Sequence, residues 1–300
     1  KSILYSIGFS SNFYFHFSGL EYGTIDGLFK PFLHTWSLSV EEQYYIIFPL
    51  SLILCFKYLR KYIIHILVST LLISLLIADW GSKNYPSITF YFLHSRMWEL
   101  LAGSILAYLE IKKYKKLENK FFNKIFPILG LTLIFFSVLF YNDKIPHPSF
   151  YTTIPVIGVC LIIWFSNKND MIKKILSSKL FVGTGLISYS LYLWHFPIFA
   201  FARIKDNTPS QYDKFEWIIL TIVLSIITYF LIEVIFRNKK IVSKKILLSS
   251  LSLFLITIVS SNSYIIFKEG FKTKYQVNAN YTIDNDYYKK EWQNFNDNIG

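Results

Sequence analysis

Charged residues are scarce in this 300-residue chain: Asp, Glu, Lys and Arg make up 17% of it, against about 25% in an ordinary soluble domain. Apolar residues make up 53%, against about 45–50% in such a domain. The composition excludes a disordered chain, because disordered segments are poor in apolar residues and rich in charge. The 29 Phe, 22 Tyr and 7 Trp also argue against two small soluble cores.

Cysteine is almost absent. Cys55 and Cys160 both fall inside apolar stretches, where a thiol behaves as a small apolar group, so no disulfide framework is expected. The patterns CxxC, GxGxxG, P-loop and HExxH do not occur in the sequence, which leaves soluble-type nucleotide and zinc sites without support. We expect neither a metal nor a resident cofactor.

Long apolar runs are what the chain has in abundance. Most approach the length of about 20 residues that a helix needs to cross a bilayer core of about 30 Å. They cover residues 38–59, 62–78, 88–109, 125–141, 150–166, 183–202, 216–236 and 246–267. A buried soluble helix bundle is the alternative, but the runs 180–202 and 246–267 contain no charged residue. The sequence predicts an all-α integral membrane protein, a polytopic bundle of about eight transmembrane helices.

The net charge of +12 is distributed by loop. Loops 57–61, 112–124, 168–179 and 237–245 hold 18 Lys and Arg, whereas loops 79–87, 142–149 and 203–215 hold 5. Such alternation follows the positive-inside rule for an even number of crossings and predicts that both chain ends lie outside the cytoplasm. A nucleic-acid partner is not expected, since its binding would gather basic residues on one face.

Four segments follow from this topology: an extracytoplasmic loop (1–37), a transmembrane core (38–237), a basic cytoplasmic loop with an additional transmembrane helix (238–267) and an extracytoplasmic linker (268–300). Lys1 is not preceded by Met, and residues 1–37 lack the pattern of a signal peptide. We therefore expect the chain to be a piece of a longer protein.

Ionisable residues inside apolar spans are costly and mark candidate functional sites. Glu41 and Glu42 lie at the predicted outer mouth of the first span, where adjacent helical positions allow at most one carboxylate to face the bundle. The alternative is that both are solvated among lipid headgroups. Arg96 and Glu99 share a helix face, and Arg96 is expected about 12 Å below the outer end of the span at about 1.5 Å per residue. A structural ion pair is the alternative to an anion or carbonyl site.

Two further groups occur near the end of the core. Ser188, Tyr192 and His195 are spaced to align a hydroxyl, a phenol and an imidazole on one helix face. Imidazole is the usual general acid or base near neutral pH, although an intramembrane His is as often a packing residue. Glu233 and Arg237, four residues apart, are expected to form an ion pair that anchors the seventh span.

These blocks, in this order, resemble the membrane acyltransferase family of type 3, integral-membrane enzymes that O-acylate cell-surface glycans. The segments that carry the resemblance are HTWSLSVEEQYYIIFPL (34–50), with His34 and Trp36 at its start, then WELLAG (98–103) and SYSLYLWHFPIF (188–199). The similarity extends over about residues 10–237. One departure is Ile235, where the family tends to carry Pro.

The resemblance implies a function in a bacterial inner membrane: transfer of an acyl group, acetyl by preference, from cytoplasmic acyl-CoA to a hydroxyl of an extracytoplasmic glycan. Lipopolysaccharide O-antigen and peptidoglycan are the expected acceptors, in that order. It implies catalytic roles for His195, Glu41 and Glu42, and substrate-binding roles for the other six candidates: His34, Trp36, Arg96, Glu99, Ser188 and Tyr192.

The resemblance also implies that parts of the family are missing here. These are the first helices, which carry a His and a cytoplasmic Arg pair for acyl-CoA, and an external domain of the SGNH hydrolase type after the linker. Two other functions fit the composition: a proton-coupled transporter or flippase of a cell-envelope intermediate, in which the buried ionisable groups relay protons, and a scaffold for the external domain.

Overall fold

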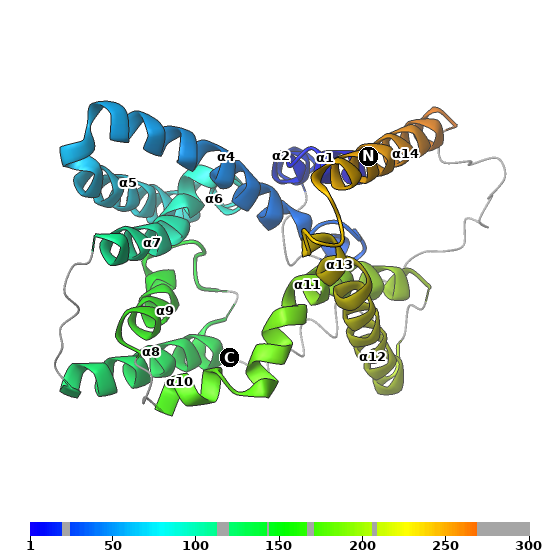
Figure 1. Ribbon diagram of the computed structural model, residues 1–300. Helices are drawn as coiled ribbons and strands as arrows, with labels where there is room; N and C mark the ends of the chain where they lie inside the picture. The colour runs from blue at the N-terminus through cyan, green and yellow to red at the C-terminus, as the bar shows by residue number, and fades with distance from the viewer. Residues whose placement is uncertain (20–24, 113–119, 143, 167–170, 206–208, 269–300) are drawn as a thin grey trace. The chain divides into compact units, whose positions relative to one another are not determined.

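The computed structural model describes residues 1–19, 25–112, 120–142, 144–166, 171–205 and 209–268 (Figure 1). Every regular element in these ranges is a helix. Six helical segments are long and apolar enough to cross a membrane: α4 (Thr35–Tyr58), the 3-10 helix η1 (Arg60–Tyr62) with α5 (Ile63–Asn84), α8 (Lys120–Phe140), α11 (Lys179–Lys205), α12 (Gln211–Thr228) with the π-helix η3 (Tyr229–Glu233) and α13 (Val234–Arg237), and α14 (Lys244–Phe267). The predicted fold class, a polytopic helical membrane protein, is confirmed.

The two remaining predicted spans are shorter or interrupted. The stretch 88–109 is divided between α6 (Pro86–Tyr91) and α7 (Leu93–Ile111) by the extended backbone of Phe92. The stretch 150–166 forms the 3-10 helix η2 (Phe150–Thr152) and α9 (Thr153–Phe165). The expected depth of Arg96 assumed one helix from residue 88, whereas α7 begins at Leu93 and places Arg96 near its start. The depth itself stays a prediction.

Contacts divide the chain into two compact units, Lys1–Trp36 with Gly183–Gly300 (unit 1) and Ser37–Val182 (unit 2). In unit 2, α5 packs against α7 and α8 packs against α9 (Figure 1). The hydroxyl of Ser74 in α5 donates to the carbonyl of His94 at 2.6 Å and accepts from the backbone N–H of Trp98 at 3.1 Å. These two bonds give backbone groups near the start of α7 hydrogen-bond partners, which lipid chains could not provide. The short helix α10 (Met171–Leu176) follows α9.

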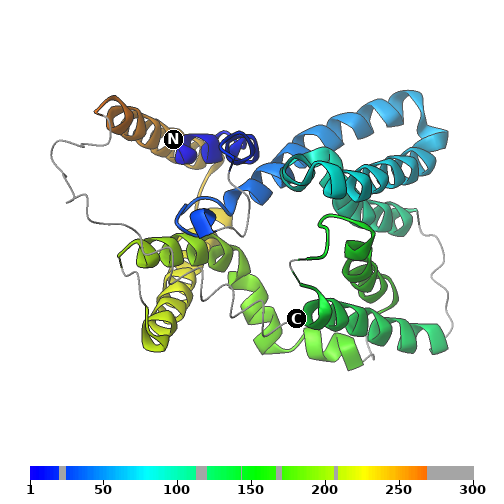
Figure 2. The ribbon, with the colours of Figure 1, turned by 180° about the vertical axis from the view of Figure 1, so that it is seen from behind.

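Unit 1 begins with short helices where the sequence predicted only a loop: α1 (Ser2–Ile7), α2 (Ser11–Phe17) and α3 (Ile25–Leu28). The hydroxyl of Thr35, at the start of α4, connects α1 and α2. It lies 2.8 Å from the hydroxyl of Ser6 and 3.1 Å from that of Ser11, and it donates to the carbonyl of Phe32 at 2.7 Å. Helix α14 lies beside α1 in both views (Figure 2).

Large apolar side chains are exposed along the spans, among them Leu76, Phe135, Ile219 and Leu253. No residue of α14 is buried. A bilayer would cover such surfaces, because lipid chains are as apolar as these side chains. The sidedness of the termini stays a prediction. The predicted linker lies, beyond Lys268, outside the described residues, as do the basic-loop segments 113–119 and 167–170.

Helices α8 and α9 approach most closely at Gly130 and Gly158. A Cβ added to Gly130 would lie 2.4 Å from the carbonyl oxygen of Gly158, and a Cβ on Gly158 would lie 2.6 Å from the carbonyl oxygen of Gly130. Both distances are shorter than any van der Waals contact. Each helix therefore needs glycine at this crossing, as small residues allow close backbone approach between membrane helices.

We expect Gly130→Ala and Gly158→Ala each to destabilise the protein by about 1–3 kcal/mol, the cost of overpacking a well-packed contact. The measurement is thermal unfolding in detergent. Gly103→Ala is the matched control in the same unit, because its Cβ would meet no described atom within 4 Å. Equal melting temperatures for Gly158→Ala and Gly103→Ala would contradict the close crossing.

Candidate active site

His34 is the most enclosed of the predicted site residues, with 3% of its surface exposed. It precedes α4 directly, so the hydroxyl network of Thr35 fixes its backbone. From α11, the hydroxyl of Tyr192 donates a short hydrogen bond to the carbonyl oxygen of His34. The N-terminal segment and α11, 158 residues apart in sequence, thus meet at His34.

Three rings of α11 surround the His34 imidazole. Phe196 stacks on it, with ring centroids 5.2 Å apart. Tyr192 and His195 meet it edge-on, with centroids at 5.1 and 5.4 Å. The structure thus brings together three of the predicted site residues: His34, Tyr192 and His195.

The Nδ1 atom of His195 lies 3.2 Å from the carbonyl oxygen of Leu191, one turn earlier in α11. A carbonyl oxygen only accepts hydrogen bonds, so Nδ1 carries the proton in this contact. The neutral ring then presents an unprotonated Nε2. This tautomer is the one in which Nε2 can act as a general base.

Two other predicted residues of unit 1 do not join this cluster by the contacts described. Ser188 is exposed and its hydroxyl donates to the carbonyl of Gly185 in its own helix, at 2.8 Å. Ser188, Tyr192 and His195 lie in one continuous helix, as their spacing requires, but the recorded bond of Ser188 is to its own helix and not to the His34 cluster. Trp36 lies in the first turn of α4 and is half-buried.

The opposite face of α11 is bound to the next span. Ser190 is fully buried and its hydroxyl donates a short hydrogen bond to Glu233. One turn later, Trp194 Nε1 donates to the hydroxyl of Thr228 at 2.9 Å. The π-helix η3 lies between these partners and ends at Glu233; such segments are rare and recur at functional sites.

The predicted ion pair between Glu233 and Arg237 is wrong: the structure records no such pair between these two described residues, and the Glu233 carboxylate accepts from Ser190 instead. The physical reason is burial. A hydroxyl with no access to water needs a partner within the protein, whereas Arg237, at the end of α13, is exposed. Ser190 was missed by sequence reasoning, because one serine in an apolar run gives no signal.

Unit 2 holds the remaining predicted site residues. Glu41 and Glu42 are consecutive residues of α4, Glu41 exposed and Glu42 half-buried. On the same helix, Tyr44 is buried and its hydroxyl lies 2.8 Å from that of Ser104 in α7. This bond fixes the rotation of α4 against α7 and so sets the directions of the two carboxylates.

The predicted pair of Arg96 and Glu99 forms, with Nη1 of Arg96 3.2 Å from a carboxylate oxygen. Arg96 has three further contacts. Its Nε donates to the carbonyl of Phe90 at 3.3 Å, its guanidinium lies 4.9 Å from the centroid of the Phe90 ring, and its Nη1 lies 2.9 Å from Nε2 of His147. Since arginine only donates, Nε2 of His147 is the acceptor.

His147 belongs to the loop between α8 and η2 and was not predicted as a site residue. Part of its side chain is exposed, while its ring packs against Phe90 at 6.1 Å and against Arg96. Desolvation of the ring, followed by the charge of Arg96, lowers the pKa of His147 to about 4. The imidazole is therefore neutral near pH 7, as its accepted hydrogen bond requires.

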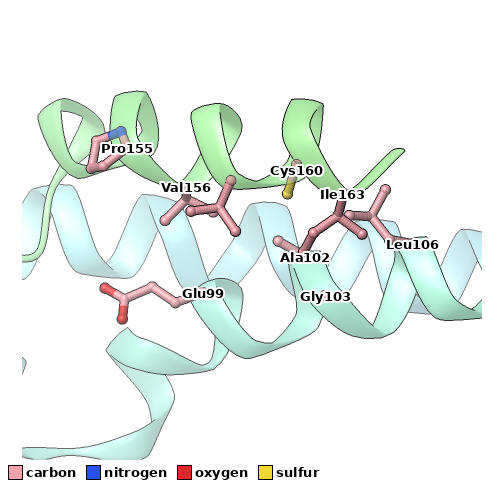
Figure 3. A pocket seen from close by; sticks show the side chains of 9 residues that line it. Glu99, Ala102, Gly103, Leu106, Pro155, Val156, Cys160 and Ile163 are labelled. Atoms are coloured by element: carbon pink, nitrogen blue, oxygen red, sulfur yellow. The ribbon is translucent and has the colours of Figure 1, made fainter. Parts of the chain in front are cut away.

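A groove of about 280 Å³ runs between α7 and α9. Figure 3 shows Glu99 at one end, with Ala102, Gly103 and Leu106 along α7 and Val156, Cys160 and Ile163 opposite on α9. Apart from the Glu99 carboxylate its lining is apolar. Within the described part of the chain, no group of three or more His, Cys, Asp or Glu side chains is placed to hold a metal ion.

The Ser190–Glu233 contact can be tested by stability. We expect Glu233→Ala to destabilise the protein by about 0.6 kcal/mol, the average for hydrogen bonds between membrane helices, and by no more than about 1.7 kcal/mol. A double-mutant cycle with Ser190→Ala should show coupling, whereas a cycle with Arg237→Ala should not. Thermal unfolding in detergent gives both values. Coupling to Arg237 without coupling to Ser190 would restore the ion pair that the sequence suggested.

The lowered pKa of His147 predicts how the free energy of unfolding changes with pH. Between pH 6.5, the ordinary pKa of histidine, and about 4, the unfolded chain binds a proton at this site that the folded protein does not, so stability falls as the pH falls through that window. His147→Gln retains an acceptor for Arg96 and removes the titration. We expect the variant to lose about 2–4 °C less in melting temperature than the wild type between pH 7.5 and 4.5.

His65→Gln, at an exposed position of α5, is the control for loss of a histidine and should behave as the wild type. If His147→Gln and the wild type show the same pH dependence, His147 does not titrate as proposed.

The sequence similarity to known proteins covers the segments that contain these polar clusters. A family model described as an acyltransferase domain, that of the acyltransferase 3 family, matches residues 2–237. This range contains the His34–Tyr192–His195 cluster, the Ser190–Glu233 contact and the Arg96 site. No solved structure matches the chain.

Three relatives show the range of similarity. An uncharacterized protein of Haemophilus influenzae is 36% identical over 182 residues, which cover 57% of this chain and 73% of that protein. A Staphylococcus aureus protein named "Putative O-acetyltransferase" is 31% identical over 226 residues, 71% of this chain and 37% of that protein. The peptidoglycan O-acetyltransferase OatA of Listeria monocytogenes is 27% identical over 253 residues, 79% of this chain and 40% of that enzyme.

The chain thus spans about two fifths of the length of the two relatives named as O-acetyltransferases. The family match covers most of this chain and includes each of the polar clusters described above. The protein belongs to the acyltransferase 3 family of membrane O-acyltransferases.

Proposed function

We propose that this chain is the membrane part of an O-acetyltransferase that moves an acetyl group from cytoplasmic acetyl-CoA to a hydroxyl of an extracytoplasmic glycan. The family match supports the reaction class. The names of the Staphylococcus and Listeria relatives support acetyl as the acyl group. Lipopolysaccharide O-antigen and peptidoglycan are the acceptors to test, and the Listeria relative's name supports the second.

The observation that carries the proposal is the contact of His34, Tyr192 and His195. In this contact the imidazole of His195, whose Nδ1 faces the Leu191 carbonyl, lies against the buried His34 between a membrane helix and the segment before α4. Acyl transfer needs such a base, because a sugar hydroxyl is a poor nucleophile until its proton is removed.

In the proposed step, His195 Nε2 takes the hydroxyl proton as the glycan oxygen attacks the acyl carbonyl carbon. The new ester C–O bond forms, the bond from the acyl carbon to the donor sulfur breaks, and the thiolate receives the proton from His195. The donor is a substrate and no resident cofactor is involved. Tyr192 acts by holding His34 and, with it, the geometry of the pair.

The other predicted residues have secondary roles in this proposal. Glu41 and Glu42 remain candidates for contact with the acceptor hydroxyl, and Arg96 and Glu99 remain candidates for contact with the acyl donor. Trp36 and Ser188 remain candidates for substrate contact. The basic loops support cytoplasmic positions for residues 57–61, 112–124, 168–179 and 237–245, and hence extracytoplasmic termini.

The test uses the complete protein in bacterial inner membranes supplied with acetyl-CoA labelled in the acetyl group. We expect label in extracted surface polysaccharide, and a loss of about 10²–10⁴-fold with His195→Gln, the usual contribution of a general base. Substitution of Glu41 and Glu42 by Gln, singly and together, tests the acceptor side. The reaction product identifies the glycan.

His65→Gln is the control for expression and folding, since His65 is exposed on α5. Label that never leaves acetyl-CoA in folded wild-type protein would refute acetyl transfer. Flux of an envelope intermediate that depends on the proton gradient and consumes no acetyl-CoA would instead identify a transporter.

A further inference from the structure

His34 has an unusual environment for a polar side chain. The residue is 3% exposed, and both of its ring nitrogens are buried without a hydrogen-bond partner among the described residues. A buried polar atom left in this state destabilises the folded protein, because it loses its hydrogen bonds to water and gains none in return. Such an atom therefore requires an explanation, and a catalytic role or a missing ligand is the usual one.

The ring is held rigidly in spite of this cost. Phe196 stacks on it at an interplanar angle of 19°, and Tyr192 and His195 fix its edges. The Tyr192 hydroxyl holds the backbone of the same residue. The ring is therefore fixed in position, and its two nitrogens can form hydrogen bonds with a substrate group that enters the site.

The other donors on this part of α11 already have acceptors. Trp194 Nε1 donates to Thr228, the Tyr192 hydroxyl donates to the His34 carbonyl, and His195 Nδ1 contacts the Leu191 carbonyl. The backbone of Pro31 acts on the His34 ring, but neither ring nitrogen forms a hydrogen bond of ordinary geometry with a described residue. The N–H of His34 is thus the donor in this cluster without a well-formed acceptor. A carbonyl oxygen, which can only accept, is the group that it would complement.

We propose that His34 is a second catalytic histidine, whose neutral imidazole donates an N–H hydrogen bond to the carbonyl oxygen of the acyl group while His195 Nε2 takes the proton of the acceptor hydroxyl. The inference rests on the proposed acyl transfer and adds the group that stabilises the negative charge on that oxygen. Attack by the hydroxyl oxygen moves an electron pair onto the carbonyl oxygen; collapse of the intermediate restores the C=O bond and expels the donor thiolate, which His195 protonates.

The surroundings of His34 suit a donor rather than a base. Burial, followed by the neighbouring His195, lowers the pKa of His34 to about 3, so the ring stays neutral and retains one N–H throughout the working pH range. A donor fixed in a site without water needs no reorganisation when the charge develops, and it contributes more there than in water. The two histidines divide the chemistry: one removes a proton and the other stabilises the oxyanion.

The experiment compares two substitutions of similar size in the complete protein. His34→Met removes the donor and leaves an apolar side chain, whereas His34→Gln keeps an N–H donor. We expect kcat to fall by about 10²–10³-fold in His34→Met, as for removal of one oxyanion donor in other enzymes, and by less than about tenfold in His34→Gln. KM for acetyl-CoA should change little, because the bond forms in the transition state.

Thermal unfolding provides the second readout. Replacing an unsatisfied buried ring by an apolar side chain should leave the melting temperature of His34→Met unchanged or raise it. Leu33→Met, a volume-conserving change at the adjacent buried position, is the control and should keep both stability and kcat. A folded His34→Met protein with wild-type kcat, or equal losses in His34→Met and His34→Gln, would overturn the inference.

If His34→Met does not fold, His34→Phe keeps an aromatic ring in the cage without a donor, and the same comparison with His34→Gln decides. Failure of the wild type to transfer any label would instead refute the proposed function itself. The two failures are therefore distinguishable in one set of assays.

Discussion

Inside a bilayer, a polar group that leaves water has to find its partner within the protein, and this requirement organises the described structure. It explains why the regular elements are helices, whose backbone groups bond within one segment. It also explains how the helices are joined. Ser74 supports the start of α7, Ser190 meets Glu233, and Tyr44 meets Ser104. Apolar side chains on the outer faces contribute little to this specificity, because lipid serves them equally well.

The same requirement distinguishes the groups that have a structural role from those available for chemistry. The guanidinium of Arg96 contacts a carboxylate, a carbonyl and an imidazole through Nε and Nη1. His34 is the contrasting case: its backbone carbonyl is held and its ring is enclosed, but its nitrogens have no partner. A polar atom that the fold holds in place and leaves unsatisfied is where a reacting group finds a complementary contact.

On helix α11, the side chains with a structural role and the side chains available for chemistry lie on different faces. Ser190 and Trp194, one turn apart, bind α12 and its π-helix. Tyr192 and His195 face the N-terminal segment. The first pair fixes the rotation of the helix, and that rotation directs the second pair at His34. In this arrangement, the short helices before α4 are part of the site, because Thr35 binds Ser6 and Ser11 and so positions the residue next to it.

The sequence by itself determined the class of the protein. Six of its eight apolar runs coincide with helices long enough to cross a membrane, since a bilayer sets a minimum length for a span; the other two runs form interrupted or shorter helices. The segments around His34, Arg96 and His195 indicated the family, and the spacing of Arg96 and Glu99 predicted their ion pair, because residues three apart on a helix are always neighbours. Only the tertiary structure decided the partners that lie far apart in the chain. Arg96 meets His147, Ser190 displaces Arg237 as the partner of Glu233, and His34 meets His195. These pairings depend on how helices rotate and cross, and helical periodicity carries no information about that.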